Sequence, residues 1–146
     1  MVDITEKDVV YREAIAEGII RLRRETLERI KKGMVEKGDV FEISKAVALS
    51  SAKLTPTLLP FCHPIRLTNV SIDYQIIDEN RLKVIVKVKA VERTGVEMEA
   101  LTAVSLALLN IWDMVKKYEK DEKGQYPETW IEYIKVIEKR KDNANK

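Results

Sequence analysis

The sequence predicts an α+β fold of the ferredoxin-like type, in which helices cover one face of a four-stranded antiparallel sheet. Two neighbouring segments, Val70–Ile76 and Leu82–Val88, each alternate apolar and polar side chains, the pattern of a strand with one buried face. A longer segment, Val96–Lys117, repeats apolar residues at helical spacing. The predicted order is strand, two short helices, strand, strand, helix and strand, which matches a split βαβ pattern.

The first three elements precede the centre of the chain. Val9–Leu22 has a composition that would also suit a helix, but its alternation of small residues favours a strand. Arg24–Lys32 is predicted to be a short helix. Asp39 and Glu42 have the spacing of a capping box and begin a second helix, which Pro56 is expected to stop.

The hairpin and the last strand complete the predicted sheet. Asp78–Asn80 supplies turn residues between the two hairpin strands. In the second strand the lysines alternate with apolar residues and are expected to face solvent; they are Lys83, Lys87 and Lys89. Trp130–Ile137 is rich in β-branched and aromatic residues and is predicted to be the last strand. The sheet face without helices would then need a partner.

The long predicted helix carries both an apolar and a polar face. Thr94 and Glu97 match a capping box, which explains Glu97 without a catalytic role. The apolar stripe consists of Leu101, Val104, Leu108, Ile111 and Val115. The opposite line consists of Glu99, Thr102, Asn110, Asp113 and Lys117, and we interpret it as a solvated face. Lys116 follows Asp113 at a spacing that allows an ion pair.

The spacing of two carboxylates on this helix limits what they can do together. Glu99 and Asp113 are fourteen residues apart in the sequence, which corresponds to roughly 21 Å along a helix. They cannot both contact one small ligand within one chain. If both belong to one site, a symmetric neighbour must supply one of them, as an isologous interface would.

Overall composition restricts the class of protein. The 146 residues favour a single domain over residues 1–146, with a frayed charged tail at Glu138–Lys146. The formal net charge of +2 gives no general attraction to nucleic acid or to an anionic membrane. One cysteine and one histidine exclude an internal disulfide and cannot supply the ligands of a typical zinc site. The chain has no apolar run of about 18 residues, so we expect a cytoplasmic protein. From its cysteine and histidine count we expect no metal site of its own.

The segment Leu59–Ile65 contains the only cysteine and the only histidine of the chain, between two prolines. Proline disfavours helix, so the segment is predicted to be extended, with Cys62 on the face opposite Phe61 and His63. His63 is either a group that exchanges protons or donates to a phosphate, or a histidine packed at a strand start. Cys62 is interpreted as a small buried apolar residue rather than a nucleophile.

Three basic residues are candidates for binding a phosphate chain: Arg12, Lys37 beside Gly38, and Lys53. Each of them alone would also fit an ordinary surface charge. The sequence contains no glycine-rich phosphate loop, no Ser-His-Asp order and no aromatic pair suited to stacking on RNA bases.

Taken together, three motifs closely resemble the cyclic pyranopterin monophosphate synthase family, the C proteins of molybdenum cofactor biosynthesis. The motifs are Lys37–Val40, Leu59–Pro64 and Thr94–Ala103, and the resemblance extends from Met1 to about Lys116. It implies conversion of 3′,8-cyclo-7,8-dihydroguanosine 5′-triphosphate, made from GTP by a radical enzyme, into cyclic pyranopterin monophosphate with loss of pyrophosphate. It also implies a homo-oligomer, a hexamer built as a trimer of dimers with the site at the dimer interface.

The resemblance also implies roles for individual residues. Asp113 would be the catalytic acid or base, with Lys37 and Lys116 beside it. The substrate-binding residues would be Phe61, Cys62, His63, Met98, Glu99, Lys53 and Arg12. Among these, Arg12, Lys53 and His63 are expected to hold the triphosphate. The sequence leaves open whether a divalent ion such as magnesium accompanies the triphosphate, and no other cofactor is implied.

Two departures from the family pattern affect these expectations. Many members carry a glycine- and lysine-rich segment after the last strand, whereas Glu138–Lys146 has no glycine and offers Lys139, Arg140 and Lys141 instead. Phe61 stands where an aliphatic residue is expected. The alternative to an enzyme is a non-catalytic ferredoxin-like module for ligand binding or regulation, and a structural assembly protein is a weaker third interpretation.

Overall fold

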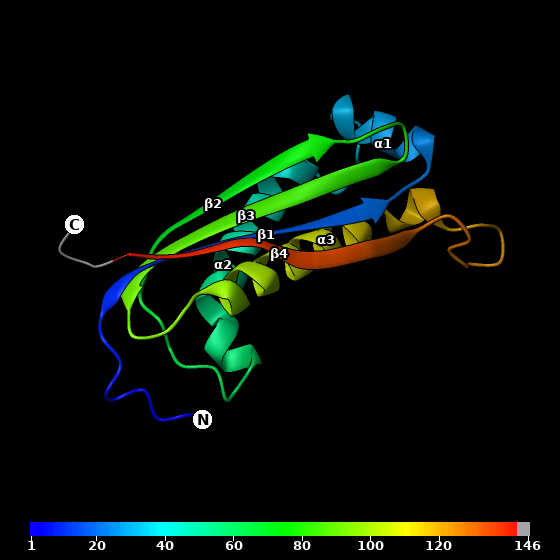
Figure 1. Ribbon diagram of the computed structural model, residues 1–146. Helices are drawn as coiled ribbons and strands as arrows, with labels where there is room; N and C mark the ends of the chain where they lie inside the picture. The colour runs from blue at the N-terminus through cyan, green and yellow to red at the C-terminus, as the bar shows by residue number, and fades with distance from the viewer. Residues whose placement is uncertain (143–146) are drawn as a thin grey trace.

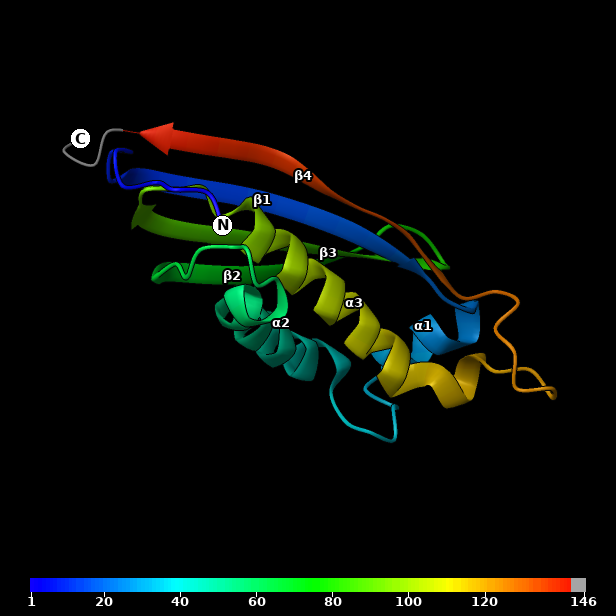
Figure 2. The same cartoon turned by 90° about the horizontal axis from the view of Figure 1, so that it is seen from below.

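The computed structural model describes residues 1–142 and places them in one antiparallel sheet with helices on one side (Figure 1). The elements in chain order are β1 (Val10–Arg21), α1 (Arg24–Lys31), α2 (Val40–Leu58), β2 (Leu67–Ile76), β3 (Arg81–Glu92), α3 (Glu97–Glu119) and β4 (Trp130–Asp142). The strand order in the sheet is β2-β3-β1-β4. Figure 2 shows the three helices on the same face of that sheet. The predicted α+β class and the predicted order of elements are confirmed.

Strand β1 lies in the middle of the sheet, paired with β3 on one edge and β4 on the other. Its small residues allow α3 to approach closely. A Cβ atom on Gly18 would lie 2.7 Å from Leu108 Cδ1 and 2.9 Å from Val104 Cγ1, so only glycine fits there. Both leucine and valine belong to the predicted apolar stripe of α3 and are fully buried. The run of small residues that made this segment ambiguous in the sequence is therefore the part of the sheet on which α3 packs.

The sheet face without helices carries two ion pairs that involve lysines of β3. Lys83 Nζ lies 3.5 Å from Glu17 Oε2, and Lys87 Nζ lies 3.4 Å from Glu13 Oε1. The two glutamates are each only 7% exposed. The lysines of β3 thus lie on the face that was predicted, but these two pair with carboxylates from β1.

Helix α2 begins as the sequence predicts and ends later. The Asp39 side chain accepts a hydrogen bond from the backbone N–H of Glu42 at 3.1 Å, as a capping residue does. The prediction that Pro56 stops the helix is wrong, because α2 continues to Leu58. Pro56 removes one backbone donor, but the face of α2 around it is buried and includes Ala52 and Thr55. Packing of this face outweighs the lost hydrogen bond.

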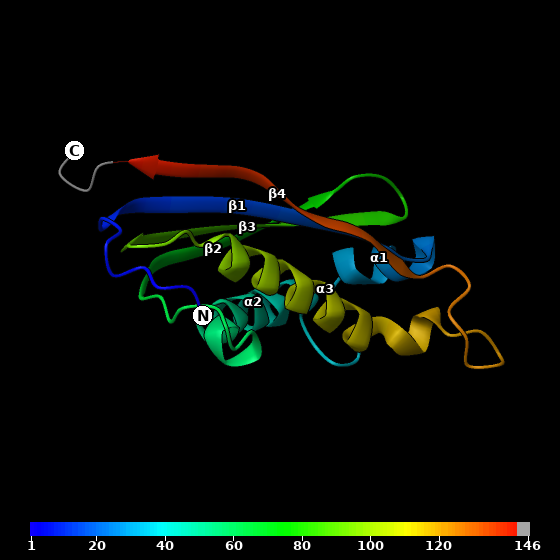
Figure 3. The same ribbon diagram turned by 60° about the horizontal axis from the view of Figure 1, so that its bottom comes forward.

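Two predictions about α3 are wrong. Its N-terminal cap is Val96, which makes no side-chain capping bond, so Thr94 and Glu97 do not form a capping box. Glu99 and Thr102 were assigned to a solvated face, but both are buried. The reason is that α3 packs on the sheet with one side and on α2 with another, as Figure 3 shows. A helix between two neighbours has less free surface than a single apolar stripe suggests.

The charged C-terminal segment is a strand and not a frayed tail as far as the structure describes it. Strand β4 continues to Asp142, and Lys139, Arg140 and Lys141 pair with residues 14, 13 and 12 of β1. Because β4 is an edge strand, its charged side chains remain in solvent while its backbone is hydrogen-bonded on one side. The rest of the predicted tail, residues 143–146, lies outside the described residues.

Helix α3 is long and apolar enough to cross a membrane by length and composition. In this fold 56% of its most apolar window is buried against the other elements. Its apolar character is therefore explained by its place between the sheet and α2.

Candidate active site

The first candidate cluster lies near the C-terminal end of α3 and joins three of the predicted site residues. Lys37 comes from the loop between α1 and α2, and its Nζ donates to Asp113 Oδ2 at 3.1 Å and to the Asp113 carbonyl at 2.9 Å. Lys116 Nζ lies 3.2 Å from Asp113 Oδ1. All three side chains remain about half exposed. One carboxylate thus lies between two ammonium groups at the molecular surface.

The loop that carries Lys37 is fixed on both sides. Gly38 has a φ of +128°, a conformation that favours glycine. Before it, the backbone N–H of Glu36 donates to Tyr118 Oη at 3.0 Å, and the Glu36 side chain pairs with Lys117 on α3. The hydrogen bonds from Lys37 and Lys116 lower the pKa of Asp113, so at neutral pH this group is an ionised carboxylate that can accept a proton.

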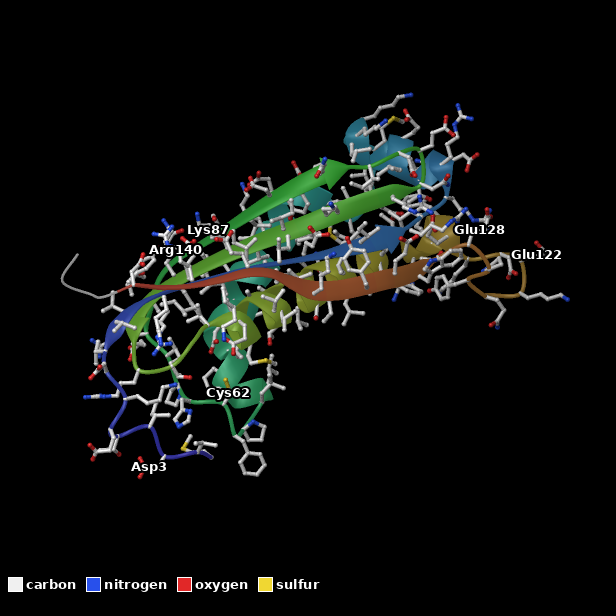
Figure 4. The ribbon with its side chains drawn as sticks, in the orientation of Figure 1. Asp3, Cys62, Lys87, Glu122, Glu128 and Arg140 are labelled. Atoms are coloured by element: carbon white, nitrogen blue, oxygen red, sulfur yellow. The ribbon has the colours of Figure 1, made fainter. Side chains whose placement is uncertain are left out.

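The second cluster lies at the N-terminal end of α3 and joins a buried carboxyl group to a half-buried thiol. Cys62 Sγ donates to Glu99 Oε2 at 3.8 Å, and Glu99 is only 1% exposed. Burial raises the pKa of Glu99. Burial, and then the charge of Glu99, raises the pKa of the Cys62 thiol, so Cys62 is a poor nucleophile at neutral pH, as predicted. Figure 4 labels Cys62 in the loop that follows α2.

The segment around Cys62 is not extended throughout, which corrects the sequence prediction. It turns at Pro60 and Phe61, and the Cys62 N–H donates to the Leu59 carbonyl at 2.9 Å. Phe61 is 78% exposed. His63 does not join Cys62 and Glu99, since its Nε2 contacts the Val2 carbonyl oxygen at 2.6 Å. Cys62 therefore contacts Glu99, whereas His63 contacts Val2.

A third group of side chains forms a basic pocket where the start of β1 and the end of β4 meet the loop before α3. Arg12 donates from its guanidinium to the carbonyls of Glu92 and Arg93, each at 3.3 Å. The pocket measures about 180 Å³ and is lined by Arg12, Glu13, Gly95, Lys139, Arg140 and Lys141. Arg12 and Lys141 are direct partners in the strand register. Like charges opposite each other destabilise a sheet, so an anion bound here would relieve the repulsion.

The site predicted from the sequence gives Glu97 no role. Lys139 enters it only as a charge in place of the family's glycine- and lysine-rich segment. Lys139 Nζ lies 3.4 Å from Glu97 Oε1 at the edge of the basic pocket. Glu97 Oε2 is buried and has no hydrogen-bond partner among the described residues, and the same is true of Glu99 Oε1. A longer last strand paired with β1 would have placed Lys139 near Arg12. The predicted strand ended at Ile137 and so did not include Lys139.

The remaining predicted residues are placed as follows. Met98 is 39% exposed and adjoins the buried Glu99 on α3. Lys53 is exposed on α2. The Asn110 side chain donates to Ser44 at 3.0 Å while Cys62 meets Glu99, so α2 and α3 run in opposite directions and Lys53 lies toward the Cys62 end. Within the described residues, no group of three His, Cys, Asp or Glu side chains could hold a metal ion.

The fold and these clusters define an α+β protein whose charged groups suit an anionic small molecule. Comparison with known proteins identifies it further: the family model described as MoaC family matches residues 1–142, and the chain belongs to that family. A probable cyclic pyranopterin monophosphate synthase of Sulfurisphaera tokodaii is 59% identical, over 97% of this chain and 93% of its own. Proteins with the same name from Sulfolobus acidocaldarius and Pyrococcus abyssi are 56% and 52% identical over 97% of this chain, covering 98% and 88% of theirs.

Proposed function

We propose that this chain converts 3′,8-cyclo-7,8-dihydroguanosine 5′-triphosphate into cyclic pyranopterin monophosphate and pyrophosphate, a step of molybdenum cofactor biosynthesis. The observation that carries the proposal is the family match over residues 1–142, together with relatives that bear the name of this synthase over nearly their whole length. The direct test is incubation with the cyclic triphosphate, followed by measurement of pyrophosphate and of a fluorescent pterin after oxidation. Absence of both products would leave a non-catalytic binding module as the better interpretation.

Proton transfer on the purine-derived ring is assigned to the exposed cluster. Asp113 is held ionised by Lys37 and Lys116 and so acts first as the base. The ammonium groups beside it can return a proton to the ring or offset negative charge as it develops. This arrangement joins an acceptor and two donors within one hydrogen-bonded unit.

The triphosphate is assigned to the basic residues at the other end of the molecule. Closing the cyclic phosphate forms a bond from a substrate hydroxyl oxygen to the α-phosphorus and breaks the bond to the β-phosphoryl group, which leaves as pyrophosphate. Arg12, with Lys53 and His63, neutralises charge on that leaving group. Lys139 and Lys141 adjoin Arg12 and take part in the same role.

The ring of the substrate would contact the buried cluster and its neighbours, which are Phe61, Cys62, Met98 and Glu99. The unpartnered oxygens of Glu97 and Glu99 suit N–H donors of a guanine-derived ring, because a buried acceptor without a donor costs free energy. Phe61 is too exposed to form a pocket wall without a second surface.

We also propose that the enzyme is a homo-oligomer, a hexamer built as a trimer of dimers, with each site at a dimer interface. Glu99 and Asp113 lie on one continuous helix, at a separation of roughly 21 Å. The apolar side chains Leu54 and Leu58 of α2, near Phe61, are more than half exposed, which suits contact with another copy. A shared site would bring Glu99 of one copy to Asp113 of another.

Mixed oligomers test the shared site. Glu99→Gln and Asp113→Asn chains are each expected to be inactive alone. After dissociation and random mixing, about a quarter of the sites should combine an intact Glu99 with an intact Asp113, because two-fold interfaces pair the residues reciprocally. Recovery of activity near that fraction supports the interface. Equal mixtures that stay inactive, although they form the same oligomers, contradict it.

The remaining expectations concern the surroundings of the reaction. A magnesium ion would enter with the substrate phosphates, since Mg²⁺ commonly binds through phosphates and few protein ligands. Removal of divalent ions with a chelator should then change the KM for the triphosphate. We assign the protein to the cytoplasm, beside the radical enzyme that supplies its substrate, with no nucleic acid or membrane as a partner.

A further inference from the structure

The first residues of the chain form a strap, residues 1–5, that lies against the loop following α2. Figure 3 shows the N-terminus beside this loop, and Figures 1 and 4 agree. The contact is made by His63, whose Nε2 lies 2.6 Å from the Val2 carbonyl oxygen. Strap and loop border an open cavity of about 650 Å³, which is also lined by Ile65, Glu92 and Arg93.

The chemistry of this contact determines which ring nitrogen carries a proton. A backbone carbonyl oxygen accepts hydrogen bonds and cannot donate them. The Nε2 atom of His63 must therefore be protonated to bond Val2 at this distance. Since Nε2 is occupied by the main chain, Nδ1 is the nitrogen that remains for a second partner.

The strap is held in place by its own turn. The Asp3 carboxylate accepts from the Thr5 backbone N–H at 2.9 Å and from the Thr5 hydroxyl at 2.6 Å. The Lys7 N–H donates to the Ile4 carbonyl at 3.0 Å, and Ile4 is half-buried while its neighbours are exposed. The Val2 side chain is 75% exposed. The contact with His63 thus depends on the course of the main chain and not on the side chain of Val2.

We propose that the N-terminal strap is a positioning element for His63, in which the Val2 carbonyl fixes Nε2 as a donor and leaves Nδ1 for the substrate. This inference rests on the proposed function, because the partner it assigns to Nδ1 is a phosphate oxygen of the triphosphate. In the protonated ring both nitrogens donate, Nε2–H to Val2 and Nδ1–H to the phosphate. The strap therefore orients the ring through Nε2 and leaves Nδ1 as the nitrogen that meets the substrate.

Spectroscopy tests the contact without any turnover. The chain has one histidine, so protein labelled with ¹⁵N-histidine gives one pair of ring nitrogens. In the intact chain the neutral ring should be the Nε2–H form, with a ring proton that exchanges slowly with water. Deletion of residues 2–4, or Asp3→Ala, should give a mixture of both neutral forms and faster exchange, whereas Val2→Ala should match the intact chain. Identical spectra in the intact and deletion variants would overturn the proposal.

Kinetics test the consequence for the reaction. Deletion of residues 2–4 should lower kcat/KM about tenfold, the effect of losing one well-placed hydrogen bond to a charged group. The same deletion in a His63→Ala background should have no further effect, because a residue acting through His63 cannot matter once the ring is gone. Equal losses in both backgrounds, with folding verified by circular dichroism, would show a merely structural strap. If the intact chain itself has no turnover, the proposed function fails, while the ring spectra still decide whether the strap holds His63.

Discussion

The two ends of α3 carry carboxylates in opposite surroundings. At the N-terminal end Glu99 is buried beside a neutral thiol, and burial raises its pKa. At the C-terminal end Asp113 is half exposed between two ammonium groups, which lower its pKa. One helix therefore carries one carboxyl group whose surroundings raise its pKa and another whose surroundings lower its pKa.

This difference has a chemical use if the two groups meet across an interface. Pairs of titratable groups whose surroundings move their pKa values apart are typical of acid–base sites, because one group can donate while the other accepts. In a single chain the helix keeps the two groups apart, so only a second copy of the chain could bring one to the other. The pKa values of the two groups also have different causes. Burial raises the pKa of Glu99, whereas the pKa of Asp113 is lowered by two side chains that can be replaced one at a time.

The largest effect is expected from removing the ionised end. Asp113→Asn keeps the shape of the side chain but removes the proton acceptor, so kcat should fall about a hundredfold to ten-thousandfold. The fold should be unchanged because the group is at the surface. Steady-state turnover of the cyclic triphosphate is the measurement, and Asp73→Asn, another exposed aspartate, is the control. A folded Asp113→Asn enzyme with full activity would remove Asp113 from the mechanism.

The sequence was sufficient to predict the exposed end and insufficient for the buried one. Asp113 and Lys116 are neighbours on any helix, because their spacing is local. The burial of Glu99 depends on α2 packing against α3, and the helical pattern of α3 alone assigned Glu99 to solvent. A non-local contact of this kind has no signature in the spacing of one element.

The basic pocket shows the same limit at the level of the sheet. Arg12 was recognised as a candidate, but Lys139 and Lys141 reach it only through the pairing of β4 with β1. The charged segment lacks the apolar alternation that identified β2 and β3, because residues 138–141 are all exposed and none of them has to be apolar. The hairpin and the long helix have clear patterns, and these predicted the fold class. The pocket depends on the charged end of β4, which has no such pattern.

A smaller effect is expected at the N-terminal end from Gly95. A Cβ atom at this position would collide with Glu97 Oε2. Gly95→Ala should displace the Glu97 carboxylate, whose buried Oε2 is proposed to accept from an N–H of the substrate ring. The KM for the triphosphate should then rise by about tenfold, with a smaller change in kcat, because loss of a charge-assisted hydrogen bond has this magnitude. Initial rates over a range of substrate concentrations separate the two constants.

The matched control for Gly95 removes the group that would collide with the new side chain. In a Glu97→Ala background, Gly95→Ala has no carboxylate to displace, so the second substitution should add little. If Gly95→Ala raises KM equally in both backgrounds, the effect does not act through Glu97, and the N-terminal end of α3 is not coupled to the basic pocket.

The smallest and most direct test of the comparison is the pH dependence of stability. The raised pKa of Glu99 means that the unfolded chain loses this proton first as pH rises above about 4.5, so the folded state loses stability over that window. The lowered pKa of Asp113 has the opposite sign: its stabilising effect is present above about pH 3.8 and is lost as pH falls. Relative to the unmodified chain, Glu99→Gln should therefore gain stability as pH rises above about 4.5, and Asp113→Asn should lose stability as pH rises toward about 3.8. Urea unfolding at a series of pH values measures both differences, and slopes of the same sign would contradict the contrast between the two ends of α3.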